Sequence, residues 1–214
     1  MHGLYLVTDR ELIGDRDFDA VVLAAVDGGA SYVQLREKDA TTRDFVQAAR
    51  RLRPPLKARG VPLIINDRVD VALAIDADGV HLGQHDLDPV TARRLLGPDA
   101  VLGLSVESMD DVVEAEDADV DYLGVSPIFE TPTKRDTLGA WGLDGLARVR
   151  RRSRHPLVAI GGLDAGNAAA AIAAGADAIA VVSAVCAAPD PRRAAADLVA
   201  QIRTGETSTT GSDQ

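Results

Sequence analysis

The chain is poor in several residue types, and each shortage excludes a class of protein. Only one of its 214 residues, Cys186, is a cysteine, which excludes an internal disulfide and a cysteine-based metal site. No apolar run approaches the roughly 18 residues that a membrane-spanning helix needs. The first apolar run, residues 4–7, is also too short for a secretory signal. We therefore expect a cytoplasmic protein with no membrane partner.

Positive charge is scarce as well. The formal net charge is -10, which argues against a nucleic-acid binder, since that function needs a basic face. The basic cluster at residues 148–154 falls at a predicted helix end, where cations suit the helix dipole. Lysine occurs only at Lys38, Lys57 and Lys134, whereas arginine is common. Lys38 and Lys134 both fall in the motifs described below.

Aromatic residues make up only 3% of the chain, although 46% of it is hydrophobic. The core must therefore consist mainly of Val, Leu, Ile and Ala. This composition suits parallel strands that are buried on both faces and covered by Ala-rich helices. The length allows one sizeable core and is short for two domains.

Short apolar runs alternate with longer amphipathic stretches along the whole chain. Such strict alternation implies a parallel sheet, and eight units in this length favour a closed barrel over a flavodoxin-like open sheet of five strands. We predict an α/β fold, a single (β/α)8 TIM barrel over residues 1–203, followed by a polar, disordered tail at 204–214. The predicted strands are Leu4–Thr8, Tyr32–Leu35, Leu63–Asn66, Gly79–Leu82, Val101–Ser105, Tyr122–Val125, Leu157–Ile160 and Ala178–Val182.

Cationic residues follow the second predicted strand, in the run QLREKD at 34–39. Alternation along the strand puts Gln34, Arg36 and Lys38 on one side. Arginine supplies paired donors and lysine a mobile charge, which together suit a diphosphate. A surface charge cluster is the alternative interpretation. The position after an inner strand gives the diphosphate interpretation the same weight as this alternative, because the catalytic residues of such barrels lie in the loops that follow the strands.

Two carboxylates follow the third and fourth predicted strands. Asp67 fits a metal ligand and a helix cap equally well. Asp86 has no evident structural task, because Asp88 already fits the cap of the next helix. Two carboxylates that face a diphosphate are typical ligands of Mg2+, with water and phosphate oxygens completing the shell. We expect one Mg2+ ion as the cofactor.

Other polar residues follow the fourth, fifth and sixth strands. His81 and His85 are interpreted as a barrel residue and a solvated loop residue, not as ligands. The fifth strand delivers Ser105. The loop at 126–134 contains two prolines and two threonines and ends in Lys134. This loop is either a simple lid or an anion-binding segment, and the retained lysine favours the second.

Glycine follows the seventh strand, at Gly161 and Gly162, and the eighth strand ends in Val182 and Ser183. Glycine-rich backbone after strands seven and eight, next to helix N-termini, is the usual phosphate site of this fold. A tight turn would explain the two glycines alone, but both strand ends together favour a phosphate site.

The motifs resemble those of the thiamine phosphate synthase family over roughly residues 4–202. They appear in the family's order and spacing: LYLVTD, QLREKD, INDRVDVALA, DGVHLGQHD, LGLS, PIFETPTK, AIGGL and VVSAV. The most specific are QLREK, the ND and HLGQxD pair, and TxTK.

The resemblance implies a transferase reaction between two phosphorylated heterocycles. In it, 4-amino-2-methyl-5-hydroxymethylpyrimidine diphosphate and 4-methyl-5-(2-phosphoethyl)thiazole, or its carboxylated form, give thiamine phosphate and diphosphate. The catalytic residues would be Arg36, Lys38, Ser105 and Lys134. The pyrimidine diphosphate would bind Gln34, Leu35, Arg36, Glu37, Lys38, Asn66, Ser105 and Lys134. The thiazole phosphate would bind Thr131, Pro132, Thr133, Gly162, Val182 and Ser183, and Mg2+ would bind Asp67 and Asp86. A homo-oligomer is expected by analogy alone.

One residue departs from the family pattern. Where members often carry a histidine, this chain has Glu107, which we exclude from the predicted site because a carboxylate beside a diphosphate is unfavourable. Three rival interpretations share the barrel: a thiazole tautomerase-like paralogue, a non-catalytic thiazole phosphate binder and a tryptophan-pathway isomerase. The presence of QLREK, Asp67 and Asp86 together argues against the tautomerase.

Overall fold

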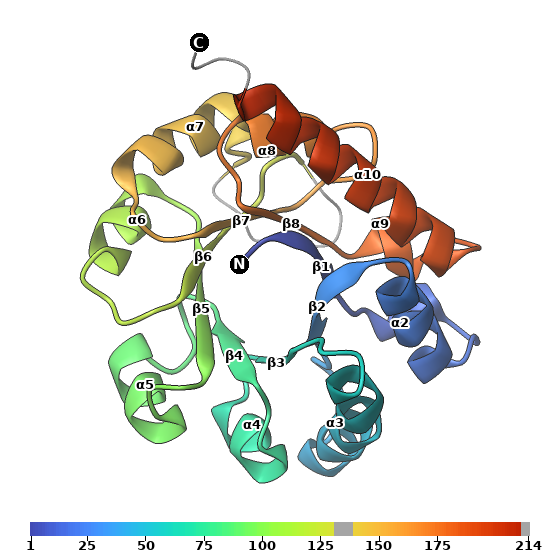
Figure 1. Cartoon of the computed structure of the whole chain (residues 1–214). Helices are drawn as coiled ribbons and strands as arrows, with labels where there is room; N and C mark the ends of the chain where they lie inside the picture. The colour runs from blue at the N-terminus through green and yellow to red at the C-terminus, as the bar shows by residue number, and fades with distance from the viewer. Residues whose placement is uncertain (131–138, 211–214) are drawn as a thin grey trace.

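The computed structural model describes residues 1–130 and 139–210, with side chains described to Ser208. Within these residues, parallel strands close into a barrel in the order β1-β2-β3-β4-β5-β6-β7-β8, and β1 pairs with β8 (Figure 1). The predicted (β/α)8 barrel is therefore confirmed. The strands are β1 (Gly3–Val7), β2 (Ala30–Leu35), β3 (Leu63–Asn66), β4 (Gly79–Leu82), β5 (Val101–Val106), β6 (Tyr122–Val125), β7 (Leu157–Ile160) and β8 (Ala178–Val181).

Alternation along the strands produces two separate apolar regions. Outward-facing residues, such as Leu35 and Leu63, pack against the surrounding helices and are fully buried. Inward-facing residues fill the barrel itself, and they include Tyr5 and Tyr122 among smaller aliphatic side chains such as Ala180. The two tyrosines therefore lie inside the barrel, where the sequence composition alone predicted aliphatic residues.

The helices surround the barrel as a ring (Figure 1). A side-chain cap begins several of them; for example, Thr91 N donates to Asp88 Oδ1 over 2.9 Å, so the predicted cap at Asp88 is confirmed. None of the described helices combines the length and the apolar composition needed to cross a membrane. The helices are α1 (Arg10–Ile13), α2 (Phe18–Asp27), α3 (Thr42–Lys57), α4 (Val69–Ile75), α5 (Pro89–Leu96), α6 (Met109–Ala115), α7 (Gly142–Arg152), α8 (Ala168–Ala173), α9 (Ser183–Cys186) and α10 (Pro191–Thr210).

The last helix is longer than the sequence indicated. The prediction of a disordered tail from residue 204 is wrong for residues 204–210, which continue α10. Gly205 lets this helix approach α8 closely, since a Cβ there would lie 2.7 Å from Cβ of Ile172. The hydroxyl of Ser208 donates to the carbonyl oxygen of Thr204 over 3.0 Å. A polar segment whose side chains bond to their own helix has the same composition as a disordered tail, so the sequence alone did not distinguish the two.

Candidate active site

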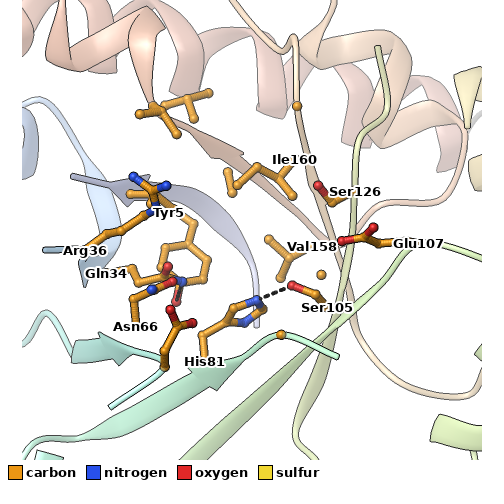
Figure 2. Close-up of a pocket in the computed structure, with 18 of the residues that line it drawn as sticks. Tyr5, Gln34, Arg36, Asn66, His81, Ser105, Glu107, Ser126, Val158 and Ile160 are labelled. Carbon is orange, nitrogen blue, oxygen red and sulfur yellow. Dashed lines mark hydrogen bonds between the residues drawn. The ribbon is translucent and has the colours of Figure 1, made fainter. Parts of the chain in front are cut away.

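A cavity of about 420 Å³ opens at the carboxyl ends of the strands. Figure 2 shows its wall, to which β1 to β8 all contribute residues. Apolar side chains such as Val158 and Ile160 line one part, and polar side chains line the rest. The cavity brings together these residues predicted from the sequence: Gln34, Arg36, Lys38, Asn66, Asp67, Asp86, Ser105, Gly162, Val182 and Ser183.

The side chains of two predicted residues do not line this cavity. Leu35 is fully buried in the core outside the barrel, and Glu37 binds Arg10 on the far side of the loop. Successive residues of a strand face opposite sides, so these two side chains lie outside the cavity wall. The predicted binding of the substrate by Leu35 and Glu37 stays a prediction. The predicted residues Thr131, Pro132, Thr133 and Lys134 lie outside the described residues.

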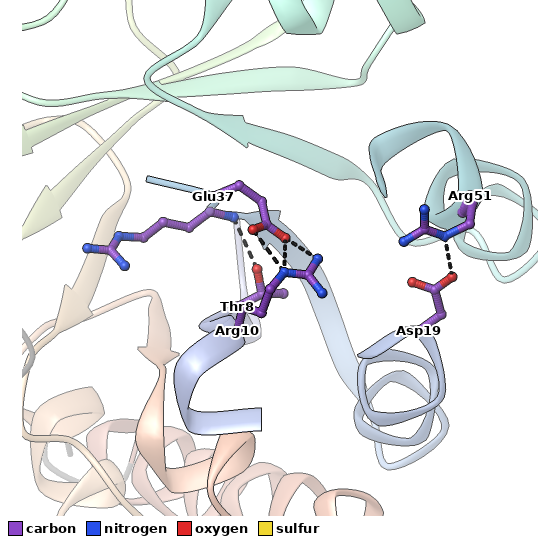
Figure 3. A network of polar contacts seen from close by, with 6 residues as sticks. Thr8, Arg10, Asp19, Glu37 and Arg51 are labelled. Carbon is purple, nitrogen blue, oxygen red and sulfur yellow. Dashed lines mark hydrogen bonds and ion pairs between the residues drawn. The ribbon is translucent and has the colours of Figure 1, made fainter. Parts of the chain in front are cut away.

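An ion pair fixes the loop after β2 (Figure 3). Arg10 Nε donates to both carboxylate oxygens of Glu37 over 3.1 Å, and the carboxylate side chain is only 6% exposed. Thr8 adds two contacts: its Oγ1 accepts from Arg36 N over 3.1 Å, and its N–H donates to Gln34 O over 2.9 Å. The loop after β1 therefore holds the backbone at 34–37 and leaves Arg36 in the cavity wall.

Asp67 does not cap a helix. The residue before α4 is Arg68, which makes no side-chain cap bond, so the capping alternative is wrong. Asp67 has a left-handed backbone with φ 63°, which is uncommon for a residue other than glycine. Its N–H donates to His81 O over 2.8 Å, which ties the end of β3 to β4. Strain of this kind is concentrated at functional sites.

The carboxylates of Asp67 and Asp86 repel each other in the cavity. Burial, and next the adjoining Asp86 carboxylate, raise the pKa of Asp67 to about 6, although Lys38 and Asn66 oppose the rise. Asp86 also has a structural contact that we did not predict, because its Oδ2 accepts from Gly83 N over 2.7 Å. A divalent cation would relieve this repulsion, so the pair fits a metal ion.

The number of acidic residues limits which ion the pair would bind. In residues 1–130 and 139–210 no group of three or more His, Cys, Asp or Glu side chains converges. Two carboxylates leave most of the coordination shell to water and ligand oxygens. This arrangement is typical of Mg2+ and unlike a closed structural zinc site.

The end of β7 adds glycine backbone to the cavity wall. Gly162 has φ 65°, and a Cβ there would lie 2.7 Å from Cβ of Phe129. Glycine is therefore required by both conformation and space. Ser183 begins α9 after β8 and lines the same cavity. Open backbone next to a first helical turn suits a phosphate, as predicted for the ends of strands seven and eight.

A chain of hydrogen bonds inside the barrel was missed by the sequence analysis. Gln34 Nε2 donates to Tyr5 Oη over 3.1 Å, and Tyr5 Oη lies 2.9 Å from Tyr122 Oη. His81 follows, with Nδ1 2.9 Å from Tyr122 Oη. Its Nε2 lies 2.9 Å from Ser105 Oγ, the contact that a dashed line marks in Figure 2. The prediction that His81 is a barrel residue agrees with this place, but its contacts were not foreseen. The scarcity of tyrosine, three in the chain, was the available signal.

Glu107 also differs from the expectation. We excluded it from the predicted site, yet it follows β5 and lines the cavity, among the side chains that Figure 2 draws. Its N–H donates to Asp111 Oδ2 over 2.8 Å, which fixes the backbone just before α6. The cavity wall therefore contains a third acidic residue, Glu107, besides Asp67 and Asp86.

The fold and the cavity define a (β/α)8-barrel protein with a polar, charged site at the carboxyl ends of its strands. The family model described as thiamine monophosphate synthase matches residues 4–185, and the chain belongs to this family of transferases. It is 58% identical to thiamine-phosphate synthase of Albidiferax ferrireducens over 188 residues, which cover 88% of this chain and 86% of that protein.

Other relatives agree. The chain is 52% identical to thiamine-phosphate synthase of Azorhizobium caulinodans over 202 residues, which cover 94% of this chain and 95% of the relative. It is also similar to the solved structure of thiamine phosphate pyrophosphorylase from Pyrococcus furiosus, with a TM-score of 0.86 and 37% identity. That similarity covers 95% of this chain and 96% of the other.

Proposed function

We propose that the chain is a thiamine phosphate synthase, which joins 4-amino-2-methyl-5-hydroxymethylpyrimidine diphosphate to the phosphoethyl thiazole. One observation carries the proposal: Arg36, Lys38 and the Asp67–Asp86 pair line the same cavity as the glycine-rich ends of β7 and β8. A diphosphate fits the first group and a monophosphate the second. The two substrates would therefore be held facing each other inside one cavity.

The reaction needs stabilisation of a leaving diphosphate. The C–O bond to the diphosphate breaks, its electron pair leaves with the diphosphate, and the thiazole nitrogen attacks the pyrimidinylmethyl cation. Arg36 and Lys38 neutralise the leaving group. Asp67 and Asp86 would hold one Mg2+ ion, which, when bound, supplies Lewis-acid charge for the same oxygens. The apolar wall at Val158 and Ile160 excludes water from the cation.

A hydrolytic mechanism fits the site less well. Ser105 Oγ lies 2.9 Å from His81 Nε2, which is the distance of a nucleophile and its base. The partner at His81 Nδ1 is the phenol of Tyr122, however, where a serine triad has a carboxylate. Burial raises the pKa of Tyr122, so this phenol stays neutral and does not stabilise an imidazolium.

An assay of the purified protein tests the proposal directly. The protein is incubated with both substrates and Mg2+, and thiamine phosphate and diphosphate are measured by mass spectrometry. Both products are expected in equal amounts, and chelation of the metal is expected to abolish them. Absence of product over a range of Mg2+ and salt concentrations would contradict the proposed function.

The Arg10–Glu37 ion pair gives a testable prediction about positioning. Either Arg10→Glu or Glu37→Arg is expected to raise the KM for the pyrimidine diphosphate by about tenfold, because like charges would displace the loop that carries Arg36 and Lys38. The combined swap, Arg10→Glu with Glu37→Arg, is expected to restore most of the affinity. Steady-state kinetics with each substrate varied in turn measures both effects.

The neighbouring Arg51–Asp19 pair provides the control. It joins α3 to α2 over 3.0 Å on the surface (Figure 3). Exposed pairs of this kind contribute little, so Arg51→Glu is expected to leave both KM values unchanged. A double swap that is no better than either single variant would show that the pair does not position the loop.

A further inference from the structure

Two glycines in neighbouring strands make room for the hydrogen-bond chain inside the barrel. A Cβ at Gly103 of β5 would lie 2.1 Å from Tyr122 Cζ, and a Cβ at Gly124 of β6 would lie 2.9 Å from His81 Cε1. Glycine weakens a strand and is found inside strands where another group approaches closely. Glycine at these two positions therefore leaves the space inside the barrel that Tyr122 and His81 occupy.

Tyr5 and Tyr122, the two tyrosines of the hydrogen-bond chain, keep their hydroxyl protons. Tyr5 is 1% exposed and Tyr122 is fully buried, and this burial raises the pKa of each phenol well above its usual range. Each hydroxyl therefore has one proton to donate, and a buried proton without an acceptor is costly. The acceptors of these two protons determine which atom donates and which accepts in every bond of the hydrogen-bond chain.

Each hydrogen bond in this chain is donated in the direction from Gln34 to Ser105. The amide nitrogen Nε2 of Gln34 can only donate, so Tyr5 Oη accepts from it and donates its own proton to Tyr122 Oη. Tyr122 then donates to His81 Nδ1. Since Nδ1 accepts, the ring proton of His81 is on Nε2, which donates to Ser105 Oγ.

The two ends of the chain acquire opposite roles in the cavity that they both line. Because Gln34 uses its nitrogen inside the barrel, its carbonyl oxygen Oε1 is left to accept a hydrogen bond. Because Ser105 Oγ already accepts from His81, its hydroxyl proton is left to donate. The cavity thus presents an acceptor at β2 and a donor at β5.

We propose that Tyr5, Tyr122 and His81 are positioning residues that determine specificity for an aminopyrimidine, by fixing Gln34 as an acceptor and Ser105 as a donor. A 4-aminopyrimidine matches this pattern, because its amino group donates and the adjacent ring nitrogen accepts. The 4-oxo form reverses both roles and meets two mismatches. The inference rests on the proposed function, since it concerns the pyrimidine substrate of that same site.

Substrate discrimination tests the proposal. The kcat/KM of the wild-type protein is measured with the 4-amino pyrimidine diphosphate and with its 4-oxo analogue, and a preference of at least about 1000-fold for the amino form is expected. Tyr122→Phe breaks the chain and is expected to reduce this ratio at least tenfold, while the KM for the thiazole phosphate stays unchanged. Tyr32→Phe is the matched control, because the Tyr32 ring lies 5.7 Å from that of Tyr5 but outside the chain.

The tautomer of His81 provides a measurement that does not depend on turnover. Nitrogen-15 NMR of histidine-labelled protein, assigned with a His81→Gln variant, is expected to show the proton on Nε2. A proton on Nδ1 would reverse the chain and overturn the proposal. If Tyr122→Phe does not fold, Tyr5→Phe replaces it in the kinetic comparison.

The outcomes separate the two proposals. Absence of turnover of either pyrimidine by the wild-type protein overturns the proposed function. Turnover by the wild-type protein with an unchanged ratio in folded Tyr122→Phe overturns the specificity proposal alone.

Discussion

Asp86→Ala and Lys38→Ala are each expected to reduce kcat at least 100-fold while the binding of thiazole phosphate is unchanged. Lys38 is proposed to neutralise the leaving diphosphate, and Asp86 would hold the metal ion that does the same, so both effects would belong to the transition state. The thiazole phosphate is proposed to bind at the other part of the cavity, around Gly162 and Ser183. Steady-state kinetics and calorimetric titration with thiazole phosphate measure the two effects.

Matched controls exist for both variants. Asp88→Ala removes a carboxylate two residues from Asp86 that caps α5, and it is expected to lower the stability of the fold without loss of kcat. Lys57→Ala removes a lysine from the end of α3, away from the cavity, and should have no effect on catalysis. If Asp86→Ala or Lys38→Ala weakened thiazole phosphate binding as much as it lowered kcat, the proposed position of the diphosphate site would be wrong.

Asp67→Asn is expected to make the metal-free protein more stable while it abolishes turnover. The folded pKa of Asp67, about 6, lies above its value in the unfolded chain, so the folded state disfavours the ionised form. Stability of the wild-type protein therefore falls as the pH rises from about 4 to about 6, and the deficit persists above that. Above pH 6 the variant should gain about 1 kcal/mol, allowing for solvent screening, or about 2–4 °C in Tm.

Thermal unfolding at pH 4 and pH 8, with and without Mg2+, measures this effect. Mg2+ is expected to raise the Tm of the wild-type protein but not that of Asp67→Asn. Asp70→Asn is the control of opposite sign, because the hydrogen bond from Arg68 lowers the pKa of Asp70, and its loss cannot increase stability. If Asp67→Asn raised the Tm equally at both pH values, the cause would be the left-handed backbone, which asparagine tolerates well, and not the loss of charge.

Local patterns were enough to predict the barrel and many of the residues that line the cavity. Alternation predicted that Gln34, at the end of β2, lies on the same side as Arg36 and Lys38, which follow the strand, and all three line the cavity. The same rule turns the side chains of Leu35 and Glu37 away from the cavity, whereas the family resemblance implies that both residues bind the substrate.

The features that were missed depend on contacts between distant segments. Tyr5 and Tyr122 are 117 positions apart, and neither has a neighbour in the sequence that indicates a hydrogen bond. The left-handed backbone of Asp67 is set by pairing with β4, so the sequence could not separate a cap from a ligand. The length of α10 depends on its packing against α8, where Gly205 allows close approach.

The pairing of β1 with β8 has a consequence for synthesis of the chain. β1 is complete at residue 7, but its second neighbour begins only at Ala178. At about 5–20 residues per second, roughly 10–40 s separate the two on the ribosome. During that interval one edge of β1 has unpaired backbone groups, which invite pairing with another chain. The closed sheet that protects the finished enzyme from aggregation thus leaves the nascent chain dependent on its last strand.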